Sequence, residues 1–267
     1  MFFRRKKEKN TASSLEEKRI EEADEKKNQE IKKREEDARR QKQYRELIES
    51  APLKVFVQKG NVIKRNTLAT MPDIKFSNIT RSTNLDKLFP MVSIDTETTG
   101  LRRSERIIEI SALKIMPGFV LAERFSTLIN PGRMIPEEVS NINGITNDMV
   151  ADAPSFGEIA FSLQSFISGC TVIGHNLAFD LEFLHCSGLI LSEKAKYIDT
   201  LDIAKKTLKS SSNVSRSDDY FSYDVSDYKL DTLCYYYGIY RPEKHRAEAD
   251  ALATAALLEK LINDKTK

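Results

Sequence analysis

Apolar residues are scarce in the first fifty positions of this chain, and this constrains the fold more than any other feature. Between Ser13 and Glu49 the chain has no glycine and no proline, and Glu, Lys, Arg and Gln dominate. A segment with so few apolar side chains cannot bury a core of its own. Any globular part must therefore come from the rest of the 267 residues, which suffice for one or two domains.

Residues 1–50, called the leader below, have the composition of a solvated helix. Good helix formers dominate, and acidic side chains recur four positions before basic ones, as in Glu22–Lys26 and Glu30–Arg34. The few apolar positions are too irregular for a coiled-coil seam. We expect a long helix or disordered tail, which serves as a spacer or as a docking arm for a protein or nucleic acid.

Net charge divides the chain into three parts. Residues 1–50 carry 16 Lys and Arg against 13 Asp and Glu, residues 51–90 carry 7 against 2, and residues 91–267 carry 19 against 25. We therefore predict a charged leader, a basic linker or small subdomain over 51–90, and one acidic domain over 91–267. The basic residues of 51–90 can help to hold a polyanion by releasing its counterions, although a solvated linker fits equally well.

Simple counts exclude membrane, secreted and zinc-finger proteins. No run approaches the roughly 18 apolar residues that a membrane span needs, and no apolar stretch of a signal peptide follows the charged N-terminus. Cys170, Cys186 and Cys234 form no CxxC pair, which argues against a zinc site and a disulfide framework. The sequence predicts a protein of a reducing compartment, the cytoplasm.

From Leu88 onward, strand-like and helix-like blocks alternate, which predicts an α/β domain with a mixed sheet flanked by helices. A turn at Pro117-Gly118 between two β-rich runs predicts an antiparallel hairpin. Strands are expected over 91–96, 107–116, 119–130, 171–174 and 197–199, and helices over 154–168, 177–186 and 247–262 and from Leu201 and Leu230. The Ser-, Asp- and Tyr-rich stretch 209–228 is expected to be an exposed loop.

The first cluster of candidate functional residues is Asp95-Thr96-Glu97, at the end of the first predicted strand. Side chains two apart on a strand share a face, so both carboxylates point one way while Val92 and Ile94 point the other. Neighbouring carboxylates repel each other unless a cation lies between them, and hard divalent cations bind carboxylate oxygens. Taken alone, the pair also fits a strand that ends in solvent.

Two further clusters lie where the chain enters a helix. His175, Asn176 and Asp180 follow a buried strand, which is a usual position for a site in an α/β sheet. His245 precedes the last predicted helix, and Asp250 lies on it. Each has an ordinary alternative, since the helix dipole favours an acid near a helix N-terminus. We interpret His185, on an apolar helix face, as structural.

Together the clusters resemble the DEDDh family of 3′→5′ exonucleases in order, spacing and neighbouring residues. The matching motifs are Asp95-x-Glu97 with Thr99-Gly100, His175-Asn176-x-x-Phe179-Asp180 and His245-Arg246-Ala247-x-x-Asp250, and Asn143-Gly144-Ile145-Thr146 is similar to a further segment. The resemblance covers about residues 91–261 and is nearest to the epsilon subunit of bacterial DNA polymerase III and the PolC exonuclease domain. It leaves the leader unmatched.

The resemblance implies an RNase H-like fold, in which the first three strands are antiparallel and helices surround a mixed sheet. It implies that Asp95, Glu97, Asp180 and Asp250 hold two Mg²⁺ or Mn²⁺ ions. His245 would be the general base for the attacking water. The expected reaction releases nucleoside 5′-monophosphates from a single-stranded or frayed 3′ end of DNA.

The same resemblance implies a seat for the terminal nucleotide. The residues expected to form it are Thr98, Thr99, Gly100, Asn176 and Phe179. The loop 209–228 lies where members of the family vary, so it can alter access of the substrate. The long leader is unlike a minimal proofreading subunit, which leaves replication, repair and turnover all open.

Two other functions stay open. A 3′→5′ exoribonuclease would use the same five catalytic residues, because they also serve members of the family that trim RNA. The chain could instead be a non-catalytic interaction module that works through a protein partner of the leader. A metal-dependent DNA exonuclease is the leading prediction, because all five positions are filled.

Overall fold

The computed structural model describes residues 29, 31–59, 65–210 and 223–266. These residues fall into two compact units that are divided between Glu49 and Ser50. In the leader, the described part is a helix over residues 31–50. The rest of the predicted leader helix lies outside the described residues, and the three-part domain division stays a prediction.

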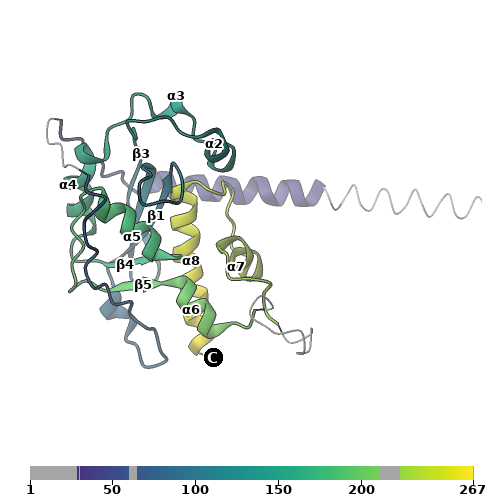
Figure 1. Cartoon of the computed structure of the whole chain (residues 1–267). Helices are drawn as coiled ribbons and strands as arrows, with labels where there is room; N and C mark the ends of the chain where they lie inside the picture. Colours follow the sequence, from purple (N-terminus) through teal and green to yellow (C-terminus); the bar gives the residue numbers. More distant parts are fainter. Residues whose placement is uncertain (1–28, 30, 60–64, 211–222, 267) are drawn as a thin grey trace, which may run out of the picture. The chain divides into compact units, whose positions relative to one another are not determined.

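A five-stranded mixed sheet in the order β3-β2-β1-β4-β5 forms the centre of the second unit (Figure 1). Its first three strands are antiparallel, and β4 and β5 continue parallel to β1. The bounds are β1 Met91–Thr98, β2 Ile107–Met116, β3 Val120–Leu128, β4 Thr171–Gly174 and β5 Tyr197–Asp199. The predicted mixed sheet is confirmed, with β1 longer and β3 shorter than predicted.

Helices surround this sheet, and those with a clear apolar period were predicted well. Their bounds are η1 Leu85–Leu88, α2 Glu137–Asn143, α3 Asn147–Val150, α4 Phe156–Ile167, α5 Leu177–Cys186, α6 Thr200–Thr207, α7 Leu230–Tyr237 and α8 Ala247–Thr266. At the start of α4, the Ser155 backbone N–H donates to Glu158 Oε2 at 2.8 Å, which forms part of a capping box. The short helices α2 and α3 were not predicted, because they have 7 and 4 residues and show no period.

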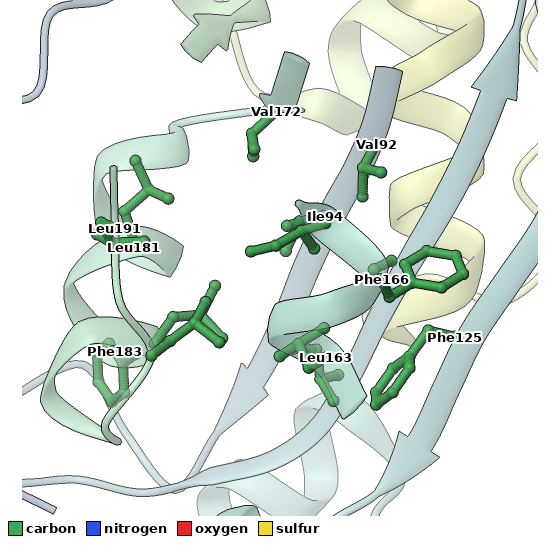
Figure 2. Close-up of a cluster of buried hydrophobic side chains, with 14 of the residues drawn as sticks. Val92, Ile94, Phe125, Leu163, Phe166, Val172, Leu181, Phe183 and Leu191 are labelled. Atoms are coloured by element: carbon green, nitrogen blue, oxygen red, sulfur yellow. The ribbon is translucent and has the colours of Figure 1, made fainter. Parts of the chain in front are cut away.

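Different helices cover the two faces of β1. Val92 and Ile94 lie in an apolar cluster with side chains of α4 and α5, and Figure 2 shows them pointing into this shared core. On the opposite face, Ser93 Oγ donates to a backbone carbonyl of α8 at 2.6 Å. Because strand side chains alternate, Asp95 and Glu97 lie on the α8 face, as predicted. The same strand therefore contributes to the core and to the candidate site.

Residues 51–90, called the strap below, reach both edges of the sheet. At the β3 edge, the Lys54 N–H donates to the Arg124 carbonyl at 2.9 Å. At the β5 edge, the Ser77 N–H donates to the Tyr197 carbonyl at 2.7 Å. Unpaired backbone groups along an edge strand would otherwise be open to pairing with other chains. The strap thus packs on the sheet along both edges, apart from residues 60–64, which are not described.

Three smaller expectations concern cysteines, membrane spans and the loop 209–228. All three cysteines lie in described residues and are buried free thiols. Among the described helices, none combines the length and apolarity needed to cross a bilayer. Most of the predicted loop lies outside the described residues, and its ends meet at a bridge between Ser210 and Val225.

Candidate active site

The end of β1 brings the first two sequence clusters together. β1 pairs with β4 only from Met91 to Ser93, so its last residues extend beyond the point where the chain leaves β4 for α5. There Thr96 Oγ1 donates to Asp180 Oδ1 of α5 at 2.7 Å. Asp180 is buried, and its carboxylate is therefore fixed beside the strand that carries Asp95 and Glu97.

The third cluster reaches the same place through α8. One ligand atom each from Glu97, His245 and Asp250 lies within 4.8 Å of the others. Asp250 is buried on α8, whereas His245 is exposed just before it. The backbone of His245 has a φ of 58°, in the left-handed region that non-glycine residues seldom adopt. This turn places the imidazole at the mouth of the site.

A cleft of about 620 Å³ contains this arrangement. The cleft is lined by the end of β1, by α6, α7 and α8, and by the segments that precede α5, α7 and α8. The lining residues are Asp95, His175, Asn176, Leu201, Tyr228, Lys229, Leu230, Asp231, Arg241, His245 and Asp250. The five predicted catalytic residues thus lie in or beside one cleft, although they are spread over more than 150 positions of the chain.

The carboxylates of the site resist ionisation when no cation is bound. Burial, followed by the charges of Asp180, Asp250 and Glu97, raises the pKa of Asp95 well above its usual range. Burial and the charge of Asp250 raise the pKa of Glu97 to about 8. Burial also raises the pKa of Asp180 to about 7, against the effect of the Thr96 hydrogen bond. A bound divalent cation would favour the ionised carboxylates.

Arg241 is a cation of the site that the sequence analysis missed. Its guanidinium donates to both carboxylate oxygens of Asp250 and to Asp231. The Arg241 side chain is only 5% exposed, so its ion pair with Asp250 is shielded from water. Arg241 precedes His245 by four positions and lies outside the recognised motifs, so no spacing in the sequence pointed to it.

Glu109 and Arg246 fix the start of α8, and this pairing was also missed. Glu109 lies opposite Glu97 in the β1–β2 register. It accepts from Arg246 Nη2 at 2.7 Å and from the Ala247 N–H at 2.9 Å. These bonds hold both residues that follow His245. The position of Glu109 between Ile108 and Ile110 was the available signal, since a buried carboxylate is nearly always paired.

The predicted nucleotide seat after Glu97 is a tight turn. Thr98 Oγ1 donates to the Gly100 carbonyl at 2.7 Å, and Thr99 Oγ1 donates to Glu105 Oε2 at 2.7 Å. Any Cβ at Gly100 would lie 3.1 Å from the Glu105 side chain, so a larger residue would crowd the turn. Both threonine hydroxyls are used inside the loop. Their part in substrate binding stays a prediction.

Asn176 and Phe179, the other two predicted seat residues, differ in position. Asn176 lines the cleft and starts α5 with a φ of 60°. Asp199, a residue the sequence analysis did not select, accepts from the Asn176 N–H at 2.9 Å and from the Leu177 N–H at 3.1 Å. Phe179 instead packs on Phe183, with ring centroids 4.8 Å apart. Their roles toward substrate also stay predictions.

His175 is a half-buried histidine at the cleft wall, and both of its ring nitrogens have partners. Its Nε2 is 2.9 Å from the Tyr228 carbonyl, and its Nδ1 is 2.9 Å from Thr200 Oγ1. A carbonyl can only accept, so Nε2 carries the proton. Burial lowers the pKa of His175 to about 4. It is therefore neutral near pH 7, and it links β4 to the segment before α7.

The motif 143–146 also reaches the site, through its first residue. Asn143 is buried, and its Nδ2 donates to Glu97 Oε2 at 3.4 Å. Gly144 follows with a φ of 72° and ends α2 in the left-handed conformation that glycine adopts easily. The end of the short helix α2 therefore places the Asn143 side-chain amide beside the Glu97 carboxylate.

Comparisons of sequence agree with this geometry. Residues 92–258 match the RNase T family, described as exonuclease. The DNA polymerase III subunit epsilon of Treponema pallidum is 38% identical over 180 residues, which cover 66% of this chain and 77% of that protein. The PolC-type DNA polymerase III of Bacillus subtilis is 33% identical over 179 residues, which cover 65% of this chain but 11% of that much longer protein.

Solved structures share the fold. E. coli exonuclease I in complex with a dT13 oligonucleotide aligns with a TM-score of 0.52 at 19% identity, over 64% of this chain and 40% of that one. The nuclease domain of 3′hExo, a DEDDh family member bound to rAMP, aligns with a TM-score of 0.50 at 17% identity, over 65% of this chain and 92% of that one. The chain therefore belongs to the RNase T exonuclease family and is a 3′→5′ exonuclease.

Proposed function

We propose that this exonuclease hydrolyses DNA from an unpaired 3′ end with the help of two divalent cations, Mg²⁺ or Mn²⁺. The products would be nucleoside 5′-monophosphates. The observation that carries the proposal is the convergence of Asp95, Glu97, Asp180 and Asp250 at one cleft whose mouth holds His245.

The donor set fits divalent cations. It consists of carboxylate oxygens, which hard cations prefer, and the group of Glu97, His245 and Asp250 is compact enough for one ion to contact. The raised pKa of Glu97, about 8, reflects its burial and the charge of the neighbouring Asp250. When bound, two ions would stabilise negative charge on the attacking and leaving oxygens of the phosphodiester.

His245 would remove the proton from the attacking water. It is exposed, so water can reach it, and its ring lies within 4.8 Å of ligand atoms of Glu97 and Asp250. Imidazole exchanges protons readily near neutral pH, which suits a general base. The pairing of Glu109 with Arg246 and the Ala247 N–H would keep His245 in this orientation.

DNA is the proposed substrate, and RNA is the second candidate. The relatives in sequence are subunits or forms of DNA polymerase III, and the similar structure of exonuclease I holds a dT13 oligonucleotide. The similar structure of 3′hExo holds rAMP instead. We place the terminal nucleotide against the turn of Thr98, Thr99 and Gly100 and beside Asn176 and Phe179.

The leader is proposed as an arm outside the catalytic unit. Its charged composition and its separation as a compact unit support this role. We propose that residues 1–50 bind a partner protein and that residues 51–90 belong functionally with the nuclease. Removal of residues 1–49 should leave kcat on a short oligonucleotide unchanged, and a loss of activity in parallel with the site variants would contradict this division.

The decisive experiment uses 5′-labelled single-stranded DNA and RNA of equal sequence with Mg²⁺, Mn²⁺ or EDTA. Asp95→Ala and His245→Ala should abolish a metal-dependent ladder that shortens from the 3′ end. Asp152→Ala, an exposed acid outside the cleft, is the matched control and should retain full activity. The faster substrate decides between DNA and RNA. A ladder that persists in EDTA or in Asp95→Ala would contradict the mechanism.

A further inference from the structure

The loop between β1 and β2, residues 99–106, is closed by its own hydrogen bonds. The Thr99 N–H donates to the Arg106 carbonyl at 2.8 Å. Glu105 accepts from Thr99 Oγ1 and lies 3.2 Å from the Arg133 guanidinium. The loop starts at the proposed nucleotide seat, so any force that fixes the loop also fixes the seat.

Arg65 of the strap binds the tip of this loop. Its Nη2 donates to the Arg103 carbonyl at 2.6 Å, and its Nη1 donates to the Ser104 carbonyl at 3.3 Å. The planar guanidinium holds two successive carbonyls at once, a geometry that a lysine ammonium does not reproduce. The strap and the loop are separated by more than thirty positions in the sequence, so this is a tertiary contact.

Arg103 of the loop in turn binds both the strap and α5. Its Nη2 donates to the Ala69 carbonyl of the strap, and its Nε donates to Cys186 Sγ at 3.0 Å. Glu182 of α5 lies 3.5 Å from the same guanidinium. The two arginines thus form reciprocal contacts, which we call the arginine latch.

The strap beside the latch is anchored to the end of α5. The Asn66 N–H donates to the Cys186 carbonyl at 2.8 Å, and His185 Nε2 is 3.0 Å from the Thr70 carbonyl. The helix α5 also carries Asp180, one of the proposed metal ligands. Loop, strap and helix therefore form one connected network that links the nucleotide seat to a carboxylate of the cleft.

We infer that Arg65 and Arg103 are positioning residues, which hold the β1–β2 loop ready to receive the 3′-terminal nucleotide. This inference rests on the proposed function and names the part of the chain that orders its substrate seat. Neither arginine is among the residues that line the cleft, so both act through the loop. A loop that is already ordered need not lose conformational freedom when substrate binds.

The latch should affect binding of substrate far more than chemistry. Arg241 holds Asp250, and Glu109 binds the two residues that follow His245; neither Arg65 nor Arg103 takes part in these bonds. Loss of the latch would leave these groups in place and would free the loop. The expected signature is a raised KM with an unchanged kcat.

The test compares Arg65→Ala, Arg65→Lys and Arg103→Ala with Arg102→Ala in the full chain. Arg102 is an exposed neighbour in the same loop and serves as the matched control. KM for a 5′-labelled single strand should rise about tenfold in both alanine variants, which is the loss expected for one or two hydrogen bonds. The value of kcat should stay within about twofold, and Arg65→Lys should recover part of the KM because one ammonium can still bond a carbonyl. Thermal unfolding of each variant is recorded beside the kinetics.

The outcomes separate this inference from the proposed function. A metal-dependent ladder from the wild type supports the function whatever the variants do. An unchanged KM in both alanine variants, or an equal rise in Arg102→Ala, would overturn the latch alone. A fall in kcat that follows the loss of thermal stability, with no rescue by lysine, would show a purely structural role. An inactive wild type would overturn both proposals.

Discussion

The two faces of β1 share one backbone but differ in what stabilises their side chains. On one face Val92 and Ile94 are stabilised by burial among the side chains of α4 and α5. On the other face Asp95 and Glu97 are crowded with acidic neighbours, and the pKa of Glu97 is raised to about 8. The first face stabilises the fold without a ligand, whereas the second gains its full stability only with a cation. The apolar core thus holds in place a group of buried carboxylates that disfavour one another's ionisation when no cation is bound.

Asp95→Asn should affect activity strongly and the stability of the fold very little. It should lower exonuclease activity by at least about 10³-fold, because a metal ligand contributes several kcal/mol of charge stabilisation. The unfolding temperature in EDTA should not fall, because the neutral amide carries no charge that burial and the acidic neighbours would oppose. Kinetics and thermal unfolding on the same sample measure both quantities. Activity that stays near the wild-type level would remove Asp95 from the site.

Ile94→Ala is the converse experiment on the core face. Ile94 is 1% exposed, so its truncation should destabilise the protein by about 2–5 kcal/mol. The folded fraction should keep its kcat within about threefold, because no atom of Ile94 belongs to the cleft. Chemical denaturation gives the free energy of unfolding. A large loss of kcat without a loss of stability would show that the core face of β1 also contributes directly to catalysis.

Glu109→Gln should loosen the approach to His245 and so affect both stability and catalysis. The neutral amide keeps the shape but weakens the bonds to Arg246 and the Ala247 N–H, so we expect a loss of about 1–3 kcal/mol in stability. The value of kcat should fall more than KM rises. Glu248→Gln, which alters a different α8 pair with Arg124, is the control. Equal effects of both variants would show that His245 is not specifically held by Glu109.

The dependence of stability on pH is the smallest expected effect. Burial raises the pKa of Glu97 to about 8 and that of Asp180 to about 7. The folded state therefore binds protons that the unfolded chain has released, and this stability is present at low pH and lost as pH rises through about 8. In EDTA, the unfolding temperature should fall by several degrees, roughly 2–4 °C per kcal/mol, between pH 6.5 and 8.5.

The interval starts at pH 6.5 because the opposite effect of His175 lies between its folded pKa of about 4 and the ordinary histidine pKa of about 6.5. Saturating Mg²⁺ should remove most of the fall, because the cation replaces the protons on the carboxylates. Asp95→Asn in EDTA should give a flatter profile than the wild type. A wild-type profile that is equally steep with and without Mg²⁺ would argue against these carboxylates as ligands.

The parts of the fold that repeat with a regular period could be predicted, and the parts made by long-range contacts could not. The bounds of β2, β4, β5 and α5 follow from apolar runs and were predicted to the residue. The convergence of Asp95, Asp180 and Asp250 was expected only from the resemblance to the DEDDh family, because each motif alone also fits an ordinary strand or helix end. Arg241 and Glu109 were missed, because a charge shows its partner only after folding, and Glu109 and Arg246 are 137 positions apart. The strap was left open for the same reason, since its contacts are made by irregular backbone.

The contact between Arg241 and Asp250 has a consequence for the charge balance of the site. When the four proposed metal ligands are ionised, they and the Arg241 guanidinium leave a surplus of three negative charges, and the neighbouring Asp231 is balanced by Lys244. One divalent ion reduces this surplus to a single negative charge, and a second ion reverses its sign. A phosphodiester carries the one negative charge that restores neutrality. Binding of the second ion and binding of the DNA strand should therefore each raise the affinity for the other. The second ion would then be held tightly only when a phosphodiester is present in the site.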